Sequence, residues 1–108
     1  MSELYRGTTP CNIFITALDL SEAEVVYLTY SQNGMPVIEK DKSQLTFGYT
    51  TETDPRCKLT VTLTQEDTLK FDKREIEIQI RARFSDGRAV ASKIITASAE
   101  RVLKDGVI

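Results

Sequence analysis

The stretch 74–84, REIEIQIRARF, has the most regular pattern in the sequence. Apolar residues alternate with charged or polar ones, which is typical of a β-strand with one face in a core and the other in solvent. The apolar set comprises Ile76, Ile78, Ile80, Ala82 and Phe84, and the polar set comprises Glu75, Glu77, Gln79, Arg81 and Arg83. Asp86-Gly87 follows and predicts a tight hairpin into a strand over 88–97.

Shorter segments with the same alternation precede this strand. They predict strands at 12–18, 24–32, 35–40, 44–49 and 58–63. Asn33-Gly34 is a two-residue hairpin signal, because both positions tolerate positive φ. Pro36 cannot donate to a β-ladder, so its strand is expected at a sheet edge. Seven strands at this spacing predict an all-β, antiparallel immunoglobulin-like β-sandwich.

One short helical turn is expected near residues 64–70, between two strands. Thr64 is suited to cap it, and Asp67 is well placed near its N-terminus. Leu69 and Phe71 are then expected to close one end of the core. Cys11 and Cys57 share the parity of apolar neighbours and are predicted to be buried, reduced thiols. The expected core comprises Ile13, Ile15, Leu28, Leu59, Val61, Leu63, Leu69, Phe71, Ile76, Ile78, Ile80 and Phe84.

The length of 108 residues predicts a single β-sandwich domain over 1–108 with short N- and C-terminal arms. Hydrophobic residues make up 41% and charged residues 28%, as in soluble globular chains. A net charge of −2 without a basic stripe argues against nucleic acid as a partner. The sequence has no apolar run of about 20 residues and no visible secretory signal, so we expect folding in a cytoplasm and no membrane partner.

The residue types do not suggest catalysis. The chain has no histidine, which is the usual general base and the commonest metal ligand. It also has no phosphate loop or nucleophile elbow. Glu66, Asp67 and Asp72 lack the spacing of a calcium loop and are expected to be solvated acids. We therefore predict a protein that is not an enzyme, with no catalytic residue, metal, cofactor or small-molecule substrate.

Two surfaces are candidates for binding another protein. The charged face of 74–84 is either an ordinary solvated face, which its mixed charges favour, or a docking surface. The apolar residues near both chain ends either cover the protein's own core or, with the edge near Pro36, reach neighbouring copies. The expected partner-binding residues are Leu4, Tyr5, Pro36, Arg81, Arg83, Val102, Leu103, Val107 and Ile108.

Five strings in the sequence carry a family resemblance. They are YRGTTPCNIFI at 5–15, VYLTYSQNGMPVIEK at 26–40, LTVTLTQEDTLKF at 59–71, EIQIRARFSDGRAVAS at 77–92 and VLKDGVI at 102–108. Over nearly its whole length the chain resembles small virion-associated β-sandwich proteins of tailed phages and prophages of Firmicutes. More loosely, it is similar to the N-terminal domain of upper-baseplate phage proteins, a likeness at the level of fold.

The resemblance implies a non-enzymatic structural component of a tailed-phage particle: a capsid-decorating, neck, or tail or baseplate module. Such a protein is made in the host cytoplasm and then becomes part of the virion. Its expected partners are other virion proteins and copies of itself. The alternative is a carbohydrate- or host-surface-binding β-sandwich module, which an aromatic platform would favour. A third interpretation is an intracellular regulator that binds a host protein.

Overall fold

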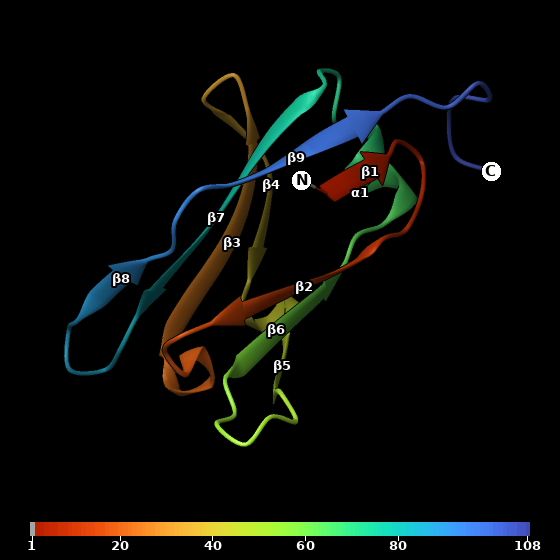
Figure 1. Cartoon of the computed structure of the whole chain (residues 1–108). Helices are drawn as coiled ribbons and strands as arrows, with labels where there is room; N and C mark the ends of the chain where they lie inside the picture. Colours follow the sequence, from red (N-terminus) through yellow and green to blue (C-terminus); the bar gives the residue numbers. More distant parts are fainter. Residues whose placement is uncertain (1) are drawn as a thin grey trace.

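A computed structural model describes residues 2–108; Met1, the first residue of the expected N-terminal arm, lies outside the described residues. Two β-sheets face each other, and a short α-helix closes one end of the space between them (Figure 1). The helical segments are α1 (Gln65–Leu69) and the 3-10 turns η1 (Leu20–Glu22) and η2 (Lys42–Gln44). The strands are β1 (Ser2–Tyr5), β2 (Cys11–Thr16), β3 (Val25–Gln32), β4 (Met35–Asp41), β5 (Thr46–Tyr49), β6 (Cys57–Thr62), β7 (Glu75–Arg83), β8 (Ala89–Ala91) and β9 (Ile95–Glu100).

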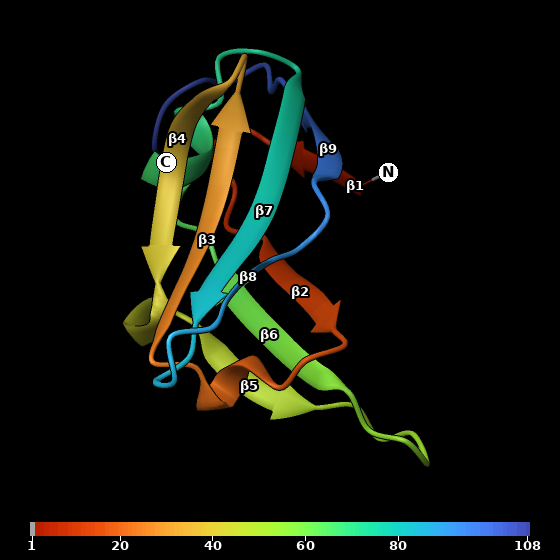
Figure 2. The ribbon, with the colours of Figure 1, turned by 90° about the vertical axis from the view of Figure 1, so that its left-hand side faces the viewer.

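The larger sheet has six strands in the order β1-β9-β7-β3-β4, with β8 also paired to β7, and the smaller has the order β2-β6-β5 (Figure 2). All pairings are antiparallel except that of β1 with β9, which is parallel. The expectation of seven strands, all antiparallel, is therefore wrong in two respects. The N-terminal segment adds an edge strand that pairs in parallel, and the segment predicted at 88–97 forms two strands.

The strand predicted over 74–84 is confirmed as β7, at the centre of the larger sheet. Its neighbour β3 contributes the other apolar row of that sheet, with Val26, Leu28 and Tyr30 buried opposite β7. The hairpin at Asn33-Gly34 is also confirmed, with φ values of 52° and 75°. Among the expected core residues, the buried ones are Leu28, Leu59, Val61, Leu63, Phe71, Ile76, Ile78 and Ile80, whereas Leu69 and Phe84 are half-buried.

The facing of β2 is the reverse of the prediction. Ile13 and Ile15 are 57% and 42% exposed, and Cys11 is exposed as well, so none of the three belongs to the core. Phe14 points inward instead and packs against the core. Asn12, on the same face, accepts a hydrogen bond from the buried hydroxyl of Tyr30 at 2.6 Å. Satisfying that hydroxyl requires the even-numbered face of β2 to point inward.

A bulge divides the segment expected to form one strand over 88–97. Before it, Ala91 pairs with Arg81; after it, Ile95 pairs with Ile78, so three residues of this segment face two of β7. At the break, the hydroxyl of Ser92 accepts from the main-chain N–H of Ile80 at 3.0 Å. Because the register shifts by one residue, Val90 faces the core before the bulge and Ala97 faces it after.

The helical turn lies where the sequence predicts it, and its cap is confirmed. The Thr64 hydroxyl accepts from the N–H of Asp67 at 3.0 Å, and the Asp67 carboxylate accepts from the N–H of Thr64 at 3.0 Å. Phe71 is 1% exposed below this turn. The expectation that Asp67 is solvated is wrong, because it is 8% exposed and its Oδ2 lies 2.9 Å from Nζ of Lys40.

The two cysteines are unpaired thiols, one exposed and one buried. Cys11 pairs with Thr62 and Cys57 with Thr16, so five residues of the same ladder, about 17 Å, separate them. A disulfide needs Cα atoms within about 7 Å.

We therefore expect a thiol reagent such as Ellman's to titrate two thiols after unfolding without reductant. In the native protein Cys11 should react rapidly and the buried Cys57 only as fast as the protein opens. Cys11→Ser should remove the fast phase alone. A fast phase that survives this substitution, or fewer than two thiols in the unfolded chain, would contradict the assignment.

Candidate functional site

The expected partner-binding residues near the N-terminus differ in accessibility. Leu4 is 4% exposed, because pairing of β1 with β9 turns its side chain toward the interior between the sheets. Tyr5, the next residue, points outward and is 48% exposed. Tyr5 is thus available to a partner in this structure, whereas Leu4 serves the protein's own core.

Pro36, Arg81 and Arg83 are all exposed but do not form one surface. Pro36 lies on β4, which is an edge strand as predicted, and pairs with Ser31 of β3. Arg83 pairs with Val25 at the other end of β3, about 20 Å away, and its guanidinium donates to the Glu24 carboxylate at 3.0 Å.

The C-terminal segment after β9 presents apolar side chains while its main chain is held. Leu103 is 97% exposed, Val107 55% and Ile108 87%, whereas Val102 is half-buried. The side-chain amide of Gln65 accepts from the N–H of Ile108 at 2.9 Å, which holds the chain end to α1. This segment is the part of the expected partner-binding set with the greatest exposed apolar surface.

Sequence reasoning missed the outer face of the smaller sheet, because the facing of β2 was predicted in reverse. Among its residues, only Lys58 is charged, and the two isoleucines lie side by side along β2. The threonines alternate regularly along β6, a signal that this side of the sheet faces outward. The outer face comprises Cys11, Ile13, Ile15, Thr46, Gly48, Lys58, Thr60 and Thr62.

The edge of β2 beside this face carries unpaired main-chain groups. The N–H of Leu63 donates to the carbonyl of Pro10, so the even-numbered residues of β2 exchange hydrogen bonds with β6. The N–H and C=O groups of Cys11, Ile13 and Ile15 therefore point away from β6. In the part of the chain that the structure describes, β2 has no partner on that side. We call this the β2 edge.

The other sheet edges carry features that discourage strand addition. β4 contains Pro36, and a register shift leaves Val37 without a partner. Three charged residues, Glu39, Lys40 and Asp41, complete the same strand. β1 and β5 are only four residues long. Proline, bulges, charge and shortness are the usual protections of an edge, and β2 has six residues with none of the first three.

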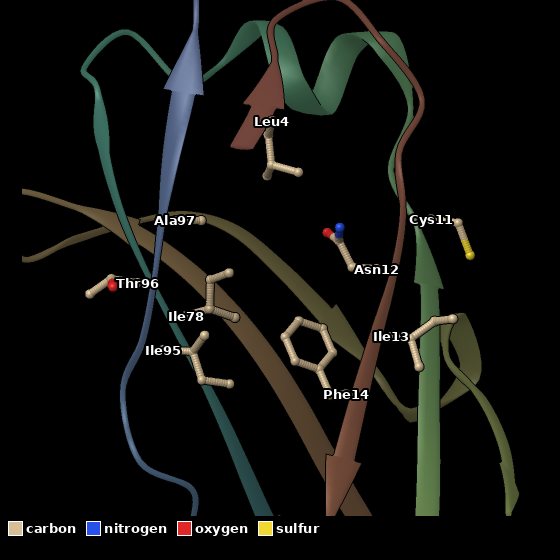
Figure 3. Close-up of a pocket in the computed structure, with 9 residues that line it drawn as sticks. All are labelled: Leu4, Cys11, Asn12, Ile13, Phe14, Ile78, Ile95, Thr96 and Ala97. Atoms are coloured by element: carbon tan, nitrogen blue, oxygen red, sulfur yellow. The ribbon is translucent and has the colours of Figure 1, made fainter. Parts of the chain in front are cut away.

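A cavity of about 190 Å³ opens between β2 and the larger sheet, next to the β2 edge (Figure 3). Its apolar lining includes Phe14 from β2, Ile78 from β7, Ile95 from β9 and Leu4 from β1. Figure 3 shows the side chains of Phe14 and Asn12 on the cavity side of β2, with those of Cys11 and Ile13 on the other side. The sandwich is therefore incompletely filled at this edge.

A second hollow, of about 450 Å³, lies where the loop between α1 and β7 meets the end of β9 and Arg6. Both signs of charge line it, and Arg74 Nη2 lies 3.6 Å from Glu100 Oε2. Because acidic side chains lie among the basic ones, the hollow is not a selective site for an anion. Its charged residues are Arg6, Asp72, Lys73, Arg74, Glu100 and Arg101.

Two ionisable groups inside the sandwich, Asp67 and Tyr30, have shifted pKa values. Burial raises the pKa of Asp67, but the N–H of Thr64 and the ammonium of Lys40 outweigh it, so the pKa lies below its ordinary value. Burial, aided by the charge of Asp67, raises the pKa of Tyr30 well above its ordinary value. The ion pair between Lys40 and Asp67 joins β4 to α1.

Within residues 2–108, no three histidine, cysteine, aspartate or glutamate side chains are gathered so as to hold a metal ion. The helices of this same range are all too short or too polar to cross a membrane. The exposed tyrosines Tyr5, Tyr27 and Tyr49 lie on β1, β3 and β5, in two different sheets. They do not come together as a stacking platform.

Comparisons of the chain with known protein families, with curated proteins and with solved structures found no match.

Proposed function

We propose that this protein is a non-enzymatic structural component of a tailed-phage particle and acts through protein–protein contacts in a repeating assembly. Its fold is taken to be a variant of the immunoglobulin-like sandwich, with one parallel edge strand added. Its partners are other virion proteins and copies of itself. The proposal rests on the resemblance of five strings along the chain and on one structural observation, the amount of apolar surface that this small fold leaves exposed.

Two groups of exposed apolar residues lie close together in the sequence. Ile13 and Ile15 lie next to each other on the outer face, and Leu103, Val107 and Ile108 lie on the C-terminal segment. Burying one such side chain fully is worth about 1.5 to 3 kcal/mol. Scattered single apolar residues are normal on a protein surface, but contiguous groups mark interaction sites.

The C-terminal segment is suited to contact a neighbouring subunit. Its main chain is anchored at Gln65 and near Arg6, whose guanidinium lies 3.2 Å from the Asp105 carboxylate. The apolar side chains are thereby presented from a held backbone, so less conformational entropy is lost on binding than for a free tail. The segment serves as the contact arm in this proposal.

Mass spectrometry of purified particles from the phage or prophage that encodes the chain tests the function. The expected result is the protein at a stoichiometry comparable with known structural proteins of the particle. Its absence from particles, together with its presence in the infected cell, would overturn the proposal. Recovery on host cell walls instead would favour the carbohydrate- or host-surface-binding alternative.

The double substitution Leu103→Ser with Ile108→Ser tests the contact arm. Both side chains are nearly fully exposed, so we expect thermal unfolding of the purified protein to change little. Incorporation into particles should fall at least severalfold. Ile94→Ser is the matched control, because Ile94 is 56% exposed in the bulge between β8 and β9. Full incorporation of the double variant would show that the C-terminal segment is not the attachment surface.

A further inference from the structure

We infer that the β2 edge pairs with the β2 edge of a second copy, so that two smaller sheets join into one continuous antiparallel sheet. The inference extends the proposed function by naming the partner of one surface. It rests on that proposal only in taking protein–protein contact as the protein's task. Its test uses the purified protein, so the two can fail independently.

The main chain of the β2 edge is suited to pair with a second copy of itself. The N–H and C=O groups of Cys11, Ile13 and Ile15 point outward in a row with no partner in the described residues. Such a row is a template for another strand, and the partner strand must present the complementary row. A second β2 edge presents it by symmetry, because each of these residues offers one donor and one acceptor.

The side chains of two β2 strands also match across a two-fold axis. Antiparallel pairing centred on Phe14 places Ile13 opposite the second copy's Ile15, in a hydrogen-bonded pair on the outer face. It places Phe14 opposite the second copy's Phe14 on the inner face. Asn12 then faces the second copy's Thr16. Apolar residues meet apolar residues, and polar residues meet polar ones.

The cavity beside the β2 edge offers room for a side chain of the second copy. The second copy's Phe14 would enter on the inner face, where the cavity of about 190 Å³ is lined by Phe14, Leu4, Ile78 and Ile95. A cavity of about 150 Å³ is known to hold a benzene ring. The incoming aromatic ring therefore has a site of suitable size between the sheets, lined by these apolar side chains and by the polar Asn12 and Thr96, that the chain itself leaves unfilled (Figure 3).

Charge favours a second copy over a charged strand from another protein. Cys11–Thr16 carries no charge, so two copies meet without like-charge repulsion at the contact. The net charge of −2 per chain adds only weak repulsion at a distance in physiological salt. Pairing of two six-residue strands is also isologous, which closes the assembly at a dimer at this contact.

Analytical ultracentrifugation of the purified protein and two double variants tests the inference. The wild type should sediment with about twice the 12.2 kDa mass of one chain. I13K/I15K and I13E/I15E should each be monomeric, because like charges then stand directly opposite each other across the dimer axis. An equal mixture of the two variants should restore the dimer, since each lysine faces a glutamate. L103S/I108S, which leaves β2 unchanged, should remain dimeric.

Circular dichroism and thermal unfolding verify that the charged variants are folded. If either variant does not fold, I13T/I15T replaces it, and its dimer dissociation constant should rise at least tenfold while the main-chain pairing is kept. A monomeric wild type at its highest soluble concentration would overturn the inference. A dimer that persists in both charged variants, or a mixture that stays monomeric, would also overturn it.

Discussion

Replacing Phe71 with alanine is expected to lower the free energy of unfolding by about 3 to 5 kcal/mol. Phe71 is 1% exposed, and its ring lies 6.0 Å from that of Tyr30 at an interplanar angle of 49°. It follows α1 directly, and its N–H donates to the carbonyl of Thr68 at 3.3 Å. Removal of the ring leaves a cavity at the closed end of the sandwich, which the capped turn above cannot collapse to fill.

Equilibrium unfolding in urea measures this loss, with unchanged m-values as the condition for comparing free energies. Phe47→Ala is the matched control, because Phe47 of β5 packs against the core but remains partly accessible. The free energy of unfolding should fall clearly less in Phe47→Ala than in Phe71→Ala. Equal losses for the two variants would show that the end of the sandwich below α1 is no better packed than its side.

The turn between β6 and β7 was predictable because its determinants are local. Thr64 and Asp67 are three residues apart and bond each other's main chain, so the cap is visible in the sequence. The same holds for the hairpin at Asn33-Gly34, where two adjacent residues supply the positive φ values. Regular alternation over nine residues likewise identified β7, whose facing follows from its own side chains.

The facing of β2 was not predictable from β2 alone. Its odd positions are the more apolar ones, and alternation favours burying them. The structure buries the even positions because Asn12 bonds the hydroxyl of Tyr30, a residue 18 positions away, and because Phe14 fills more of the core than either isoleucine. Because the facing of β2 was predicted in reverse, the outer face and the β2 edge, which both follow from it, were not predicted.

The parallel pairing of β1 with β9 was not predictable either, because it also depends on residues far apart in the sequence. Ser2–Tyr5 is too short to show a period, and it pairs with a strand more than ninety residues later. The bulge at Ser92 is also non-local, because Ser92 bonds the main chain of Ile80 in β7. Leu4, one of the expected partner-binding residues, is buried by this pairing, so for Leu4 the alternative that the chain ends cover the protein's own core holds.

Asp67→Ala is expected to lower the free energy of unfolding by about 3 kcal/mol at neutral pH. The substitution removes the half of the α1 cap that the Asp67 carboxylate makes with the N–H of Thr64. It also leaves the Lys40 ammonium, whose side chain is 13% exposed, without its partner at 2.9 Å. Lys40→Met is the matched variant, because it keeps the apolar stem and leaves Asp67 bonded to the N–H of Thr64. Lys40→Met should lower the free energy of unfolding by less than Asp67→Ala does. The double variant should lower it by less than the sum of the two single substitutions.

The pH dependence provides a second test of the ion pair. The pKa of Asp67 in the folded protein lies below its ordinary value of 3.8, so the unfolded chain takes up a proton first as the pH falls. The contribution of Asp67 is fully present above about pH 5 and is lost as the pH falls through the folded-state pKa. The difference between wild type and Asp67→Ala in urea unfolding should therefore be constant from pH 7 to about pH 5 and shrink below pH 4. A difference that stays constant, or grows, in acid would mean that the Asp67 carboxylate is not stabilised by Lys40 and the Thr64 N–H in the folded state.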